Sequence, residues 1–172
     1  LGTEVLPGNY GHSIRPYGRS VRLGRPRGIN AAQHFKTMIL KQLKVGFMEV
    51  FCYLLGCEAT GEAVVIDPAG DEKRIVEKVR NSGLDIVGIV NTHGHPDHTC
   101  GNAKVAALTE AKIYMHSLDD RFFGSPEGRS LGRQMGFAPS PPADVTVEHG
   151  DTIPFGKKAL EVIHTPGHTP GG

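Results

Sequence analysis

The chain has 172 residues, a formal net charge of +1, and 38% hydrophobic side chains. This length favours one domain with a sizeable core, and the near-zero charge excludes an overall polyelectrolyte. No apolar run approaches the roughly 20 residues that a membrane span needs, so no membrane partner is expected. Its three cysteines are too few for a disulfide scaffold, so a reducing, cytoplasmic location is expected.

The first 34 residues are rich in glycine, proline and arginine and show little periodicity. We interpret residues 1–34 as a basic, extended or partly disordered arm that precedes a folded domain at residues 35–172. Because arginine is abundant and acidic residues are almost absent, the arm resembles a transit peptide, and import into an organelle is the alternative location. The arm has too few aromatic residues for a base-stacking platform, so nucleic acid is not the favoured partner.

From Thr37 onward, strand and helix signals alternate along the chain. Helices are predicted at residues 71–81 and 101–111. A glycine- and proline-rich stretch at residues 117–142 is expected to form a long loop with at most one helical turn. This order predicts an α/β fold with a mixed sheet and outer helices. The predicted strands are residues 38–40, 43–45, 47–55, 63–66, 86–90, 112–115, 145–147, 153–155 and 160–163.

A dense group of candidate metal ligands follows the strand at residues 86–90, in the sequence NTHGHPDH at residues 91–98. Its HxHxDH pattern supplies three imidazoles and one carboxylate, which are ligands that zinc and similar cations prefer. His93 and His95 are two residues apart, so an extended backbone would direct both to one face. Pro96 argues against a helix here and therefore against the helical HExxH type of zinc site.

A second histidine-bearing turn, HTPGHTPGG at residues 164–172, again follows a predicted strand. The combination of THGHPDH with HTPGHTPGG resembles the metallo-β-lactamase-fold hydrolases, and most closely their glyoxalase II-like branch. The resemblance extends from about Lys36 to Gly172. It implies a metallo-β-lactamase-like αββα sandwich that is C-terminally incomplete, because this chain matches the N-terminal half and part of the second half.

The same resemblance implies that His93, His95 and His168 bind a first metal ion, with Asp97 and His98 belonging to a second. The ion would be zinc, with iron or manganese as alternatives. In the family the remaining ligands of the second metal lie downstream of the last residue here, so we expect one well-held ion and a weak or absent second ion. Asp97 is also the candidate catalytic residue, since a carboxylate there can accept a proton or orient the attacking water.

Asp67 and His164 are candidates for residues that support the ligands. Asp67 ends a predicted strand, and relatives place an aspartate there to steady the ligand loop through hydrogen bonds; an ordinary turn role is the alternative. His164 is expected to support or pack against its turn, because the three-histidine set is already complete.

The sequence is compatible with three functions. The resemblance implies metal-dependent hydrolysis of a thioester, or a related ester or amide, in a small-molecule substrate by metal-bound hydroxide. The alternatives are a non-haem iron persulfide dioxygenase, because such sites also hold iron, and a catalytically incomplete binding module. Because one sheet would otherwise be uncovered, we expect the chain to be a fragment of a longer protein or to form a homo-oligomer.

Overall fold

The computed structural model describes residues 38–172, so the predicted arm at residues 1–34 lies outside the described part. Six strands of this part form one sheet in the order β1-β2-β3-β4-β5-β6, and two more form the hairpin β7-β8. None of its helices has the length and apolar run that crossing a bilayer needs. The strands are β1 (Met38–Val45), β2 (Val50–Cys57), β3 (Glu62–Ile66), β4 (Asp85–Val90), β5 (Lys112–His116), β6 (Val145–Val147), β7 (Thr152–Phe155) and β8 (Lys158–Glu161).

The sheet is mixed, and its parallel half determines where the histidines lie. β1, β2 and β3 pair antiparallel, whereas β3, β4, β5 and β6 pair parallel. The carboxyl ends of the parallel strands therefore meet at one edge, which is where α/β sheets commonly hold their sites. The helices that connect or follow these strands are α1 (Glu72–Arg80), α2 (Pro96–Thr99), α3 (Asn102–Thr109), α4 (Ser117–Phe123) and α5 (Pro126–Gln134).

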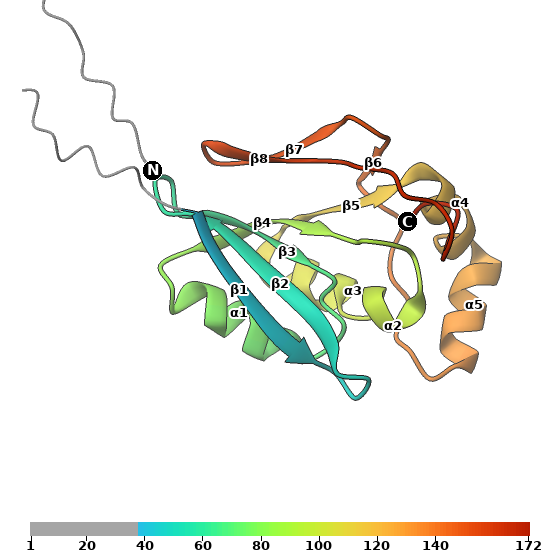
Figure 1. Ribbon diagram of the computed structural model, residues 1–172. Helices are drawn as coiled ribbons and strands as arrows, with labels where there is room; N and C mark the ends of the chain where they lie inside the picture. Colours follow the sequence, from blue (N-terminus) through green and yellow to red (C-terminus); the bar gives the residue numbers. More distant parts are fainter. Residues whose placement is uncertain (1–37) are drawn as a thin grey trace, which may run out of the picture. The chain divides into compact units, whose positions relative to one another are not determined.

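One hydrophobic core lies between the sheet and the helices on one face, α1 and α3 (Figure 1). α1 contributes Ile75, Val76 and Val79, whose spacing gives the helix a single apolar stripe. Leu54 of β2 and Val65 of β3 point into the same core. Burial of these side chains holds the helix layer on the sheet, as the alternation of strands and helices predicts.

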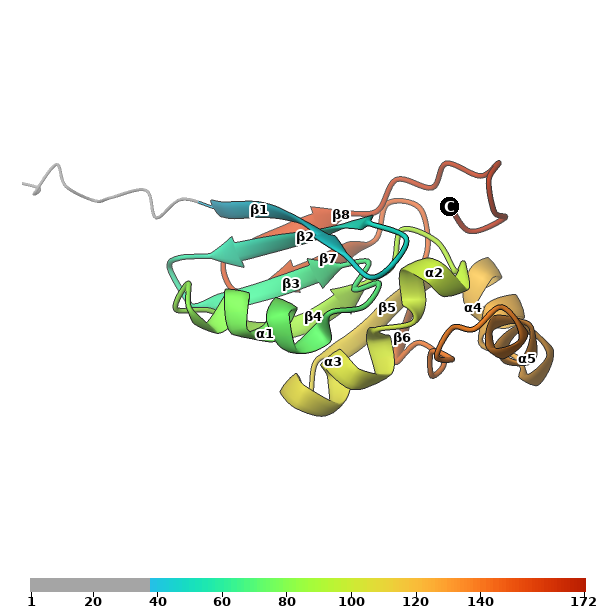
Figure 2. The ribbon, with the colours of Figure 1, turned by 90° about the horizontal axis from the view of Figure 1, so that it is seen from below.

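A second core lies on the opposite face, under the β7-β8 hairpin (Figures 1 and 2). Leu55 and Val64 are the chain neighbours of residues in the first core, and they point to this second face because successive strand residues alternate. Phe155 of β7 packs against them and is 1% exposed. The central strands are therefore buried on both faces, and the described residues supply a helix layer, a large sheet and the beginning of a second sheet.

The predicted long loop at residues 117–142 is wrong, because the structure places α4 and α5 there. Ser125 caps α5 by accepting a hydrogen bond from Gly128 N at 3.1 Å, and Pro126 occupies the first turn, where a missing N–H costs nothing. Gly128 and Gly132 look like helix breakers in the sequence. Both are buried, and Gly132 lies against Pro96, so these glycines allow close packing of a helix.

Two local predictions also need correction. The strand predicted at residues 47–55 begins later, at Val50, because residues 46–49 form the turn of the β1-β2 hairpin, with positive φ at Gly46 (67°) and Glu49 (52°). Pro96 does not exclude a helix, because it stands at the first position of the short helix α2. Proline is tolerated at that position, since its ring meets no preceding turn there.

Candidate metal centre

Two turns that are far apart in sequence bring three histidines together. His93 and His95 follow β4, and His168 lies in the turn that follows β8. One ring nitrogen from each histidine lies within 4.8 Å of the other two. The ring centroids of His93 and His95 lie 4.9 Å and 4.6 Å from that of His168. Three imidazoles in this arrangement leave a fourth position of a tetrahedral site for solvent or substrate.

Backbone hydrogen bonds fix the shape of each turn. At the start of the first turn, Asn91 N donates to Tyr114 O at 3.0 Å and so continues the β4-β5 pairing by one residue. The second turn is closed by Thr165 N, which donates to Gly172 O at 2.7 Å. Both histidine-bearing turns therefore have their own local support.

The environment of His93 and His95 lowers the pKa of both imidazoles. Burial, reinforced by the neighbouring His98, lowers the pKa of the His93 imidazole to about 4. Burial and the adjacent His168 also lower the pKa of His95. Since metal ions bind the neutral imidazole, these shifts favour a metal over a proton at neutral pH.

Asp67 is 3% exposed, and its carboxylate contacts both Thr92 and His98. Its Oδ1 accepts from Thr92 N at 2.8 Å, and its Oδ2 accepts from the Thr92 hydroxyl at 2.6 Å. Oδ2 also lies 3.0 Å from His98 Nδ1. The structure thus shows Asp67 hydrogen-bonded to the loop that carries the histidines, which is the arrangement expected for a residue that steadies it.

The Thr92 hydroxyl determines which nitrogen of His93 is free. Its single proton is donated to Asp67, so at the 3.0 Å contact with His93 Nδ1 the hydroxyl oxygen accepts. Nδ1 of His93 therefore carries the ring proton, and Nε2 presents a lone pair. Nε2 is buried and has no hydrogen-bond partner. A buried polar atom without a partner is costly, and a cation held by the three histidines would satisfy it.

Asp97 and His98, the predicted half of a second metal site, lie side by side. His98 Nε2 is 3.7 Å from Asp97 Oδ2. Burial on its own lowers the pKa of His98, but the hydrogen bond to Asp67 and the charges of Asp67 and Asp97 outweigh it and raise that pKa. His98 also forms a group with Asp67 and His93, in which His98 contacts Asp67 directly and His93 contacts the Thr92 hydroxyl that donates to Asp67. The ligand and proton-accepting roles of Asp97 stay predictions.

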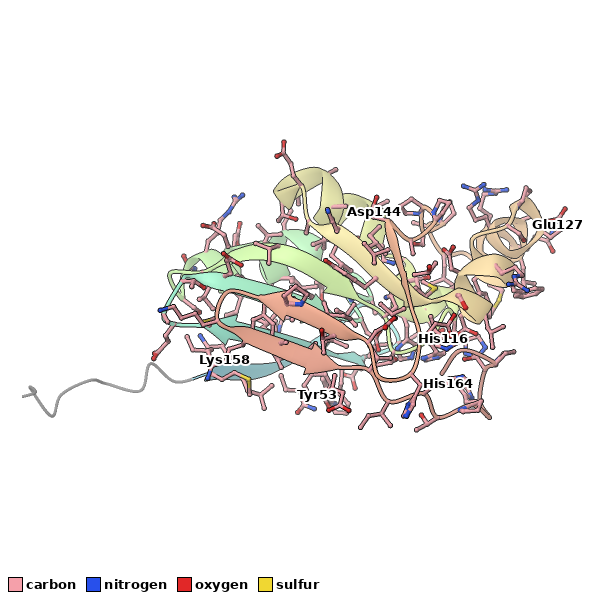
Figure 3. The ribbon with its side chains drawn as sticks, turned by 90° about the horizontal axis from the view of Figure 1, so that it is seen from above. Tyr53, His116, Glu127, Asp144, Lys158 and His164 are labelled. Atoms are coloured by element: carbon pink, nitrogen blue, oxygen red, sulfur yellow. The ribbon has the colours of Figure 1, made fainter. Side chains whose placement is uncertain are left out.

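His164 supports the second turn from within. Its Nε2 lies 2.8 Å from Pro170 O, so this N–H donates across the HTPGHTPGG turn. Its ring stacks on that of His116 with centroids 4.1 Å apart and an interplanar angle of 19° (Figure 3). His164 is not part of the three-histidine group, and its supporting role stays a prediction.

Asp119 is a buried residue of the site that was not predicted from the sequence, because it lies in the stretch predicted to be a loop. Asp119 is 0% exposed. Its carboxylate accepts hydrogen bonds from Gly94 N, the Thr169 hydroxyl and Gly171 N, each at 2.7 Å. The sequence signal that could have indicated it is an acidic residue in the first turn of a helix, where the dipole favours negative charge.

Comparison with known proteins assigns the family. The model of the Metallo-beta-lactamase superfamily matches residues 45–172. An uncharacterized protein of Aquifex aeolicus is 38% identical, over 78% of this chain and 63% of its own length. A hydroxyacylglutathione hydrolase of Polaromonas sp. is 41% identical over 69% of this chain and 39% of its own length. The human persulfide dioxygenase ETHE1 is 33% identical, over 78% and 46%.

Solved structures agree with this assignment. BLEG-1 B3 metallo-beta-lactamase matches with a TM-score of 0.68 and 27% identity, over 77% of this chain and 64% of that chain. TTHA1623 in a di-iron-bound form matches with a TM-score of 0.63 and 28% identity, over 76% and 63%. This chain therefore spans less than two thirds of the length of these proteins, and the predicted fold class is confirmed over the part that it spans. By the family model and by the fold, the chain belongs to the metallo-beta-lactamase superfamily.

Proposed function

We propose that this chain carries the metal-binding site of a hydrolase that acts on a thioester, or a related ester or amide, in a small molecule. The convergence of His93, His95 and His168 from two separate turns carries this proposal. The 41% identity to a hydroxyacylglutathione hydrolase supports the substrate class. Proteins of this superfamily bind divalent metals, and zinc is the ion proposed here, since three neutral imidazoles are ligands that it prefers.

A divalent cation held by the three histidines would lower the pKa of a bound water toward about 7 and so supply hydroxide at neutral pH. The chain's own residues prepare the site for that step. Asp67 and Thr92 hold His93 in the tautomer that presents Nε2. Asp97 is partly exposed at the same loop, with 28% of its side chain accessible, and is proposed to accept a proton or orient water. His168 is exposed, so substrate can reach the group from solvent.

A second candidate is an iron-dependent dioxygenase that acts on a persulfide. It is favoured by the 33% identity to human persulfide dioxygenase ETHE1 and by the match to ETHE1 from Myxococcus xanthus, with a TM-score of 0.59. The chemistry of the ligands allows it, because imidazole nitrogen suits iron as well as zinc.

One set of assays separates these candidates. The purified protein is analysed for bound metals, loaded with zinc or iron, and assayed for thioester hydrolysis and for oxygen uptake with a persulfide. Zinc-dependent thioester turnover that disappears in His95→Ala supports the hydrolase. Iron-dependent oxygen uptake supports the dioxygenase. Thioester turnover that persists in the metal-free protein contradicts the proposal.

A further inference from the structure

Asp119 of α4 is a buried carboxylate that both histidine-bearing turns share. Gly94 N, between His93 and His95, donates to its Oδ2 at 2.7 Å. The hydroxyl of Thr169, the residue after His168, donates to the same oxygen at 2.7 Å. Gly171 N donates to Oδ1, also at 2.7 Å. One side chain thus accepts hydrogen bonds from the residue between His93 and His95 and from two residues of the His168 turn.

The two turns have no direct hydrogen bond to each other within residues 38–172. The first turn is bonded to β5 and Asp67, and the second is bonded internally and to His149. Over the same residues, Asp119 is the group that hydrogen-bonds to both. Within the described residues, Asp119 therefore links the turn of His95 to the turn of His168 by hydrogen bonds.

Glycine at both contact points lets the backbone reach the carboxylate and its helix. A Cβ atom at Gly171 would lie 2.7 Å from Asp119 Cγ, and one at Gly94 would collide with the ring of Phe123, also in α4. The Phe123 ring in turn packs edge-on against His95, with centroids 5.4 Å apart. α4 therefore fits closely against the backbone of both turns.

Aspartate side chains are rarely fully buried unless they are paired, and Asp119 is 0% exposed. A carboxylate removed from water is costly unless it is paired or hydrogen-bonded. Over the described residues no lysine, arginine or histidine forms a salt bridge with Asp119. Its carboxylate instead accepts hydrogen bonds from two backbone N–H groups and one hydroxyl, and all three donors belong to the turns that carry the histidines.

We infer that Asp119 is a positioning residue that sets the distance between the His93–His95 turn and the His168 turn, and so preorganises the site for a cation. This inference rests on the proposed metal site. When two ligand-bearing turns are fixed before the cation binds, the cation does not have to order them, and affinity rises. Residues that orient ligands in this way typically contribute roughly 10- to 100-fold to metal affinity.

Asp119→Asn tests the inference with little change in shape. An amide offers one acceptor oxygen, and its NH2 group then faces an N–H donor, so at least one of the three hydrogen bonds is lost. We expect the dissociation constant for Zn²⁺, measured by competition with a chromophoric chelator, to rise roughly 10- to 100-fold. The visible absorption bands of the Co²⁺-loaded variant should change in position or intensity, because the ligand geometry changes.

Asp120→Asn is the matched control. Asp120 is the next residue of α4; its carboxylate accepts one hydrogen bond, from Ala143 N at 2.7 Å, and none from either turn. A purely structural role for aspartates of α4 predicts that both variants lose stability while the Co²⁺ spectrum stays the same. The inference predicts a changed spectrum and affinity for Asp119→Asn and wild-type values for Asp120→Asn.

Thr169→Val covers the outcome in which Asp119→Asn does not fold. It removes one of the three hydrogen bonds and leaves the carboxylate in place, and we expect Zn²⁺ to bind several-fold more weakly. Wild-type affinity and an unchanged Co²⁺ spectrum in Asp119→Asn, or in Thr169→Val if the former does not fold, overturn the inference while the proposed metal site stands. If the wild-type protein binds neither cation, the proposed function fails and the inference fails with it.

Discussion

The Nδ1 atom of His98 lies 3.0 Å from the Oδ2 atom of Asp67, and this contact joins the end of β3 to helix α2. The same carboxylate accepts two hydrogen bonds from Thr92. Asp67, which follows β3, is thereby hydrogen-bonded to the loop that follows the neighbouring strand β4. Asp67 has φ of 49°, a left-handed conformation that aspartate and asparagine tolerate better than most residues.

Asp67→Asn should keep this backbone conformation and lose charge-assisted hydrogen bonds. We expect the free energy of unfolding of the metal-free protein to fall by about 2 kcal/mol, the typical value for hydrogen bonds to a charged group. Urea denaturation measures it. Asp71→Asn is the matched control, because Asp71 also has positive φ (52°) but forms an exposed pair with Arg74. Equal losses in the two variants would argue against a special role for Asp67.

Metal binding should stabilise the wild-type protein and not a variant that lacks a ligand. A cation at about 100 times its dissociation constant adds about 2.7 kcal/mol to the free energy of unfolding. His168→Asn should abolish most of this gain while leaving the metal-free protein intact, since His168 is exposed. Lys158→Ala, at an exposed residue at the start of β8, should keep the full gain. Thermal unfolding with and without Zn²⁺ measures the difference, and an undiminished gain in His168→Asn would remove it from the ligand set.

The stability of the metal-free protein should fall in mild acid. The pKa of His93 is lowered to about 4 in the folded protein, whereas an unfolded histidine titrates near 6.5. Between these values the unfolded chain binds a proton that the folded chain does not, so stability decreases as the pH falls through this window. The raised pKa of His98 acts in the opposite sense, adding stability that is lost as the pH rises through its folded value.

His93→Asn isolates the first of these effects. The variant should show a weaker dependence of the urea midpoint on pH between about 6.5 and 4 than the wild-type protein does. His95, whose pKa is also lowered, and His98 are retained in both proteins. An equally steep dependence in His93→Asn would show that another group causes the loss of stability in acid.

Phe155 should be essential for holding the β7-β8 hairpin on the large sheet. Its side chain is 1% exposed and packs with Leu55 and Val64 in the second core. Phe155→Ala should lower the free energy of unfolding by about 3–5 kcal/mol, as large-to-small core substitutions do. Phe122→Ala, at a phenylalanine that is 54% exposed, should change it by less than about 0.5 kcal/mol. A loss in Phe155→Ala as small as that in Phe122→Ala would place the hairpin outside the cooperative fold.

The sequence by itself determined the candidate ligands and the strands that present them. THGHPDH and HTPGHTPGG combine imidazoles with glycine and proline turns, and both the ligand chemistry and the turn preference are properties of a few adjacent residues. The apolar runs of β2, β3 and β4 are equally local signals. The mixed α/β order and the family resemblance follow from these short stretches.

Tertiary structure alone decided how the turns are held together. Asp119 bonds to residues 25, 50 and 52 positions away along the chain, and no local pattern indicates which amides will surround a carboxylate. Helix α5 was not predicted for the same reason, because its glycines are explained by what packs against them, such as Pro96 against Gly132. Long-range contacts of this kind depend on the complete fold, which is why the sequence predicted the ligands but not their support.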